Sequence, residues 1–314
     1  MWILVLTAVW CVLYSLMSFA WMLGAPGFPF GAGDSRGREM GSLLASAHPV
    51  PTGLALGCGA VVAAAAAVWA LRRPGRAPGV VLLVCAAALL AVVPDVRLLQ
   101  NLAYSFGGYF GLVDWPVLNQ VLCVLGAGLL ARSALVLLRP ATGDAARWLT
   151  IGRWATLVAV LAPLPYAIQR AAWNLGIPLG VSQQFVDDLA ADVTAKGLPA
   201  IAAWGLVIPD LVGVLLTLGL VMRWGEVFPR WVPWLGGRPV PVWLAVVPAS
   251  VVSTAVTIAG LVIIRFAVAD GSVSSTAAPG LLWLPWGVAL GVATYAYAER
   301  RRASVSGRLA QRGR

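Results

Sequence analysis

Charged side chains inside long apolar stretches are the residues of this chain best suited to chemistry. Such stretches contain Arg97, Arg132, Arg170, Arg265, Asp95 and Asp210. A charge near the centre of a membrane helix costs about 2.5 to 3.5 kcal/mol on insertion scales, so it usually faces a bundle interior, where it pairs or lines a wet cavity. Arg132 and Arg265 lie near the ends of their stretches, and we expect both to reach the membrane surface instead.

One polar stripe surrounds Arg97. It is formed at i, i+3, i+7 and i+10 by Pro94, Arg97, Asn101 and Tyr104. This spacing places side chains on one helical face, so Arg97 and Asn101 are expected to point together into a bundle. Asp95 lies two positions from Arg97, and residues two apart do not face each other on a helix. We therefore expect Asp95 to pair with a neighbouring span.

A second polar stripe is formed by Tyr166, Arg170 and Asn174, at i, i+4 and i+8. If both stripes belong to spans that enter from the same side, Arg97 and Arg170 lie at similar depths, about 25 Å along their helices. Both arginines are then expected in the outer half of the membrane.

Among the carboxylates of the chain, Asp210 is expected to have the highest free-energy cost of membrane insertion. It lies about 18 Å into its predicted span and hence nearer the membrane centre. It needs a cationic partner, and Arg97 or Arg170 is the natural one. Asn119 and Gln120 begin another predicted span at the level of the arginines. The polar groups of several spans are therefore expected to converge.

Two interpretations of this convergence remain open. In the first, an outward-facing pocket binds a small anionic molecule or a lipid headgroup through Arg97, Asn101, Arg170 and Asn174, while Asp210 titrates or balances their charge. In the second, the charges form an internal ion-pair network that only fixes helix register, with the arginines reaching toward headgroups.

Prolines within the predicted spans add weight to the first interpretation. They are Pro94, Pro163, Pro165 and Pro209. A proline removes a backbone hydrogen bond and exposes carbonyl groups that can line a site, although it also kinks ordinary membrane helices. Pro209 directly precedes Asp210, so a helix break coincides with the candidate carboxylate.

The elements that must position these residues are membrane helices. Of 314 residues, 60% are hydrophobic and only 11% are charged, which excludes an ordinary soluble domain. A span needs roughly 20 apolar residues. Eight segments qualify: 1–23, 52–71, 80–102, 116–138, 154–174, 198–222, 241–266 and 280–298. The long apolar runs do not alternate as barrel strands do, so the predicted fold is an all-α polytopic transmembrane bundle.

Orientation follows from Lys and Arg, which remain in cytoplasmic loops. Most of them flank even-numbered spans on one side: Arg72, Arg73, Arg76, Arg139, Arg147, Arg153, Arg223, Arg230, Arg238, Arg300, Arg301, Arg302, Arg308, Arg312 and Arg314. Only Arg36, Arg38 and Lys196 flank the other side. We expect a multi-pass protein of the cell membrane, an uncleaved first span, one transmembrane domain over 1–299 and a basic cytoplasmic tail over 300–314, so that both termini are cytoplasmic.

Several function classes are excluded by what the sequence lacks. The net charge of +10 follows topology, and no basic-aromatic soluble stretch indicates a nucleic-acid partner. There is no P-loop, and His48 is the only histidine, which argues against a Ser-His-Asp triad, a bis-histidine haem and a histidine-rich zinc site. The four cysteines have no metal-binding spacing and are expected to pack as small apolar residues. We expect no cofactor and no metal.

Two loops carry recognisable patterns. Segment 177–198 predicts an amphipathic helix with Ser182 as N-cap. Its acidic residues, Asp187, Asp188 and Asp192, weakly resemble the magnesium-binding carboxylates of prenyl-diphosphate enzymes, but their spacing and predicted outer location favour a solvated face. The loop RWGEVFPRWVPWLGGRPVP over 223–241 is rich in Trp, Pro and Arg, as in a membrane-interface belt.

In this loop and in its overall sequence character, the chain resembles a set of uncharacterised multi-pass membrane proteins of actinobacterial type. This resemblance implies no activity. The polar stripes favour a small-molecule transporter or permease with an outward-facing pocket. A membrane-embedded transferase or cyclase acting on a lipid-like substrate, with Asp210 as general acid or base, is the first alternative. A non-catalytic scaffold or partner subunit is the second.

Overall fold

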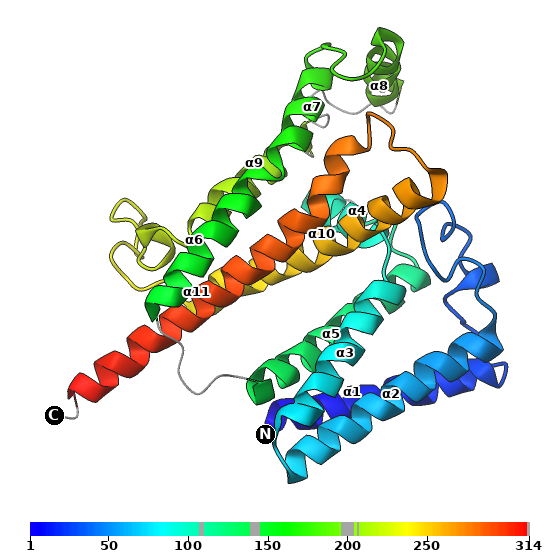
Figure 1. Cartoon of the computed structure of the whole chain (residues 1–314). Helices are drawn as coiled ribbons and strands as arrows, with labels where there is room; N and C mark the ends of the chain where they lie inside the picture. The colour runs from blue at the N-terminus through cyan, green and yellow to red at the C-terminus, as the bar shows by residue number, and fades with distance from the viewer. Residues whose placement is uncertain (107–109, 139–144, 196–203, 206, 313–314) are drawn as a thin grey trace. The chain divides into compact units, whose positions relative to one another are not determined.

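The computed structural model describes residues 1–106, 110–138, 145–195, 204–205 and 207–312, and these residues fold into helices without any strand longer than an isolated bridge (Figure 1). The chain divides into two compact units. Unit 1 comprises Met1–Asn101 and Tyr109–Ala141, and unit 2 comprises Leu102–Gly108 and Thr142–Arg314. The expected single domain over 1–299 stays a prediction.

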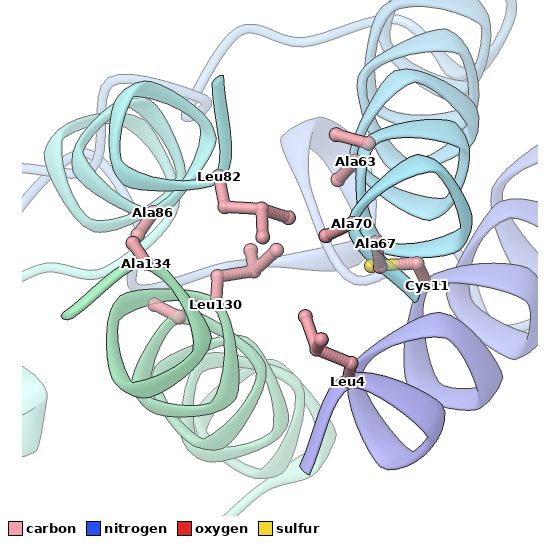
Figure 2. Close-up of a cluster of buried hydrophobic side chains, with 11 residues drawn as sticks. Leu4, Cys11, Ala63, Ala67, Ala70, Leu82, Ala86, Leu130 and Ala134 are labelled. Atoms are coloured by element: carbon pink, nitrogen blue, oxygen red, sulfur yellow. The ribbon is translucent and has the colours of Figure 1, made fainter. Parts of the chain in front are cut away.

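Unit 1 is a bundle of four long helices, α1 (Trp2–Met22), α2 (Pro49–Arg72), α3 (Arg76–Val92) and α5 (Trp115–Leu138). α1 packs along α2, and α3 packs along α5. Figure 2 shows the core between them, where alanines of α2 face Leu4, Leu82 and Leu130. Cys11 is fully buried in this core, as expected for a small apolar residue, whereas Cys58 is exposed. Small residues let the helix backbones approach closely, which is how helices associate in membranes.

The predicted span 80–102 is wrong as one continuous helix. α3 ends at Val92, and α4 (Arg97–Phe106) continues at an angle of 81° to it. Pro94 explains the break, because proline lacks an N–H donor and disfavours helical geometry in the residue before it. Asp95 then caps the new helix by accepting a hydrogen bond from the Arg97 backbone N–H at 3.0 Å. Pro94 therefore does not share a helical face with Arg97.

Unit 2 contains α6 (Ala145–Leu161), α7 (Leu164–Asn174), α8 (Gln183–Ala195), α9 (Val207–Leu218), α10 (Val242–Asp270) and α11 (Trp283–Arg312). α11 packs against both α6 and α10. The α10 and α11 backbones are in direct contact, since a Cβ at Gly260 would lie 2.2 Å from the Leu284 backbone nitrogen. α8 confirms the helix predicted within 177–198, and Ser182 Oγ accepts a hydrogen bond from the Phe185 N–H at 3.2 Å.

Among the described residues, six helical segments are long and apolar enough to cross a bilayer: Trp2–Met22, Pro49–Arg72, Trp115–Leu138, Ala146–Asn174, Val242–Ala269 and Ala278–Ala303. The bent pair α3 and α4 makes a seventh if it is one broken span. Within predicted span 198–222, the structure describes a helix of only 12 residues, α9, and residues 198–203 and 206 lie outside the described part. This pattern fits a membrane protein, while the count of eight spans and the orientation stay predictions.

Candidate functional site

The Arg97 guanidinium lies at the α3–α4 break of unit 1, between two carboxylates. Its Nη1 and Nη2 donate to Asp34 at 2.8 and 2.5 Å. Its Nε and Nη2 donate to Asp95 at 3.0 and 2.6 Å. Arg97 and Asp95 are fully buried, and Asp34 is 6% exposed. The result is a buried ion triad of two bidentate Arg–carboxylate pairs, the geometry in which a guanidinium binds a carboxylate most strongly.

Neighbouring elements hold this triad in place. Gln120 of α5 donates from Nε2 to Asp95 Oδ2 at 2.8 Å, and its Oε1 accepts from the Asp95 backbone N–H at 3.2 Å. Asp34 follows the short helix η1 (Gly31–Gly33) in the loop between α1 and α2. Gly37 allows the loop to turn tightly there, because a Cβ at this position would lie 2.8 Å from Asp34 Oδ2. We call Asp34, Asp95, Arg97 and Gln120 the Arg97 cluster.

The expectation that Asp95 turns away from Arg97 is wrong. It assumed an unbroken helix, whereas the non-helical backbone before α4 lets the Asp95 carboxylate fold back onto the guanidinium. Gln120 was predicted to lie at the level of Arg97, and its hydrogen bond to Asp95 in the same cluster confirms this. Asp34 was not foreseen, because 63 residues separate it from Arg97 and no local spacing relates them.

A second polar group surrounds α7 in unit 2. Arg170 lies over the Trp173 ring, with 5.4 Å between its Cζ and the ring centroid. Tyr166 interacts electrostatically with both Arg170 and Asp210, and α9, which carries Asp210, packs against α7. Arg170 Nε and Asp210 Oδ2 are buried, yet neither has a hydrogen-bond partner among the described residues. We call Tyr166, Arg170 and Asp210 the α7 polar cluster.

Further buried polar atoms that can still form hydrogen bonds flank this cluster. Gln169 donates from Nε2 to the Ser275 carbonyl at 2.9 Å, but its buried Oε1 has no partner in the described part of the chain. Trp283 makes an edge contact with Tyr166 at 5.2 Å between ring centroids, and its buried Nε1 is likewise without a hydrogen bond there. Because buried polar groups are rarely left unpaired, such a concentration indicates a site for water or a polar ligand.

The predicted binding residues divide between the units. Arg97 and Asn101 lie in unit 1, where Asn101 Nδ2 donates to the Arg97 carbonyl at 2.9 Å. Arg170, Asn174 and Asp210 lie in unit 2, with the half-buried Asn174 ending α7. A joint pocket of all five residues stays a prediction. Gln169 and Trp283 were missed, because neither is charged and each lies outside the predicted stripe.

The described residues contain no group of three or more His, Cys, Asp or Glu side chains that could hold a metal ion. Comparison with protein-family models, with curated proteins and with solved structures finds no match to this chain.

Proposed function

We propose that this chain is a transporter or permease-like protein of the cell membrane, and that it binds a small anionic or zwitterionic molecule at the α7 polar cluster. The observation that carries the proposal is the unpartnered pair of buried atoms, Arg170 Nε and Asp210 Oδ2. Arg97 differs, because its donors already face Asp34 and Asp95. Of the five predicted binding residues, we therefore assign the central role to Arg170 and Asp210.

The chemistry of these two groups defines the ligand. A desolvated guanidinium donor favours a carboxylate or phosphate oxygen, and a buried carboxylate oxygen favours a hydrogen-bond donor or a cation. A molecule that carries both an anionic group and a donor satisfies both. The Trp173 ring beneath Arg170 restrains the guanidinium, which reduces the ordering cost of binding.

The backbone around the cluster supports transport. α6 ends at Leu161 and α7 begins at Leu164, so a two-residue interruption at Pro163 lies next to the cluster within the single span Ala146–Asn174. α9 is short and has Pro209 in its first turn, directly before Asp210. Interrupted helices near charged residues form the binding sites of many transporters, because their free backbone groups face the ligand. Opening toward the outer side is the expectation from the orientation of the basic loops.

Thermal unfolding of the purified protein in detergent, with a panel of anionic and zwitterionic metabolites, tests this proposal. A ligand at about 100 times its Kd adds about 2.7 kcal/mol of stability, so we expect at least one compound to raise the Tm by about 5 °C. Arg170→Gln and Asp210→Asn are expected to lose this rise. Arg132→Gln, an exposed arginine of α5, is the matched control and should retain it.

The same ligand should then enter proteoliposomes that contain the wild-type chain and not those that contain Asp210→Asn. If both variants keep the full ligand-induced rise, the cluster does not bind it and the proposal is wrong. If the bound compound is chemically changed during incubation, the membrane-enzyme alternative replaces transport. Loss of stability without any ligand effect in the wild type would identify the cluster as structural.

A further inference from the structure

An apolar cavity of about 640 Å³ lies within unit 2, between the end of α9, the segment 219–240, α10 and α11. Leu216, Trp224, Phe228, Ala249 and Trp286 are among the side chains that line it. Its one hydroxyl group, on Thr217, already donates to the Gly213 carbonyl at 2.8 Å. The wall thus offers almost no hydrogen-bonding capacity, so the cavity suits hydrocarbon rather than a polar molecule.

The segment that covers the cavity is fixed to α11. Tyr297 Oη donates to the Gly225 carbonyl at 2.7 Å. Arg301 donates to the carbonyls of Glu226 and Val240, both at 2.8 Å. Arg300 bonds the Glu226 carboxylate at 3.1 Å and the Leu220 carbonyl. Because three side chains of one helix hold both ends of this segment, the cavity is a built feature of the fold.

Positive charge borders the cavity. Arg223 and Arg230 are exposed and adjoin the lining residues Trp224 and Trp231, and exposed Arg238 lies two residues before lining Val240. Among the described residues, none of the three guanidinium groups forms a hydrogen bond or an ion pair. The arginines that bind this segment there are Arg300 and Arg301. The rim therefore attracts an anion.

Tryptophans mark the same segment as interfacial. The exposed fractions of Trp231 and Trp234 are 82% and 92%, and that of Trp243, at the start of α10, is 65%. Tryptophan is enriched where a membrane protein meets lipid headgroups. A hydrocarbon-sized cavity, a cationic rim and exposed tryptophans thus coincide at one segment of unit 2. In Figure 1 this segment is the loop that connects α9 to α10.

We propose that this cavity binds an acyl chain of an anionic phospholipid, whose phosphate group is held by Arg223, Arg230 and Arg238. The apolar wall takes the chain because burial there removes it from water without leaving a polar group unpaired. The arginines select the headgroup, since a basic pocket between membrane helices favours anionic lipid over zwitterionic lipid. The α7 polar cluster is not involved.

Native mass spectrometry of the full chain tests the proposal. The delipidated protein is incubated in detergent with equal amounts of phosphatidylglycerol and phosphatidylcholine that carry the same acyl chains. We expect one retained phosphatidylglycerol in preference to phosphatidylcholine. Replacement of Arg223, Arg230 and Arg238 by Gln should reduce this preference by about fivefold for each arginine. The control replaces three exposed arginines of another basic loop, Arg72, Arg73 and Arg76, by Gln and should leave the preference unchanged.

A second pair of variants tests the cavity itself. Ala249→Phe fills the cavity and should reduce retention of both lipids, whereas Val251→Phe, on the exposed face of the same helix, should not. An unchanged Tm shows that each variant folds. Equal retention of the two lipids by the wild type, or an equal loss of preference in the control arginine variant, would overturn the headgroup site. Full retention by Ala249→Phe would overturn the acyl-chain site.

Discussion

A guanidinium group buried in an apolar bundle is stable only when its donors are matched, and Arg97 matches them with two carboxylates. The triad of Asp34, Asp95 and Arg97 uses fork-to-fork geometry on both edges of the guanidinium. Gln120 occupies one of the remaining carboxylate positions. A group so fully engaged serves to hold the α1–α2 loop, the α3–α4 break and α5 together.

Asp34→Ala should therefore destabilise the protein strongly. Removing one partner of a buried pair costs about 3 to 5 kcal/mol, because the other charge stays buried without its counterion. Glu39→Ala changes an exposed acidic residue of the same loop and should alter the free energy of unfolding by less than about 0.5 kcal/mol. Denaturant unfolding in detergent measures both. Equal stabilities for the two variants would show that the Arg97 cluster is not a structural clamp.

At the scale of elements, the long apolar helices are the part that sequence predicts well. α2 and α5 lie within a few residues of the predicted spans 52–71 and 116–138, because apolar length alone defines them. Pro94 is among the prolines that the sequence marks as possible helix breaks, but the predicted span 80–102 runs across it, since hydropathy continues there and only the backbone chemistry of proline changes. Two of the five predicted binding residues, Arg97 and Asn101, were affected in turn, because the polar stripe through Arg97 assumed one continuous helix.

The role of Arg300 and Arg301 also depends on tertiary structure. They were expected to begin a basic tail, but they lie within α11 and bind the segment that follows α9. The acceptors are mostly backbone carbonyl groups, which carry no signature in sequence. In the sequence, Arg300 and Arg301 indicate only the orientation of the chain in the membrane. Their hydrogen bonds to backbone carbonyl groups cannot be predicted from the same pattern.

Arg301→Gln should loosen the segment between α9 and α10. Hydrogen bonds from a charged donor contribute about 1.5 to 3 kcal/mol each, so their loss favours local opening by roughly tenfold or more. Limited trypsin digestion in detergent measures this opening, because Arg223 and Arg230 lie in the segment and each is followed by a tryptophan, a bond that trypsin cleaves. Arg302→Gln is the control, since Arg302 forms an ion pair with Glu299 of its own helix at 3.2 Å and, in the described part of the chain, does not bind this segment. Unchanged cleavage in Arg301→Gln would show that the hydrogen bonds of Arg301 do not hold this segment closed.

At the scale of the whole molecule, the distribution of arginine predicts the orientation. Thiol labelling of a cysteine-free chain tests it, with one cysteine introduced at Ser35 or at Pro74, both exposed. We expect a membrane-impermeant reagent to label Ser35→Cys in intact cells, because its loop is predicted to lie outside. Pro74→Cys should react only after the cells are permeabilised. The opposite pattern would reverse the predicted orientation of unit 1.

The pairing of Asp34 with Arg97 has a consequence for biogenesis. A ribosome delivers Asp34 with the first helical hairpin, long before Arg97 emerges, because 63 residues separate the two. The hairpin of α1 and α2 can therefore enter the bilayer early, but its connecting loop reaches its final form only after α3 has followed. The α1–α2 loop thus acquires its ion pair only when the chain beyond α3 has been made. A nascent chain halted before Arg97 has Asp34 in this loop without its counterion.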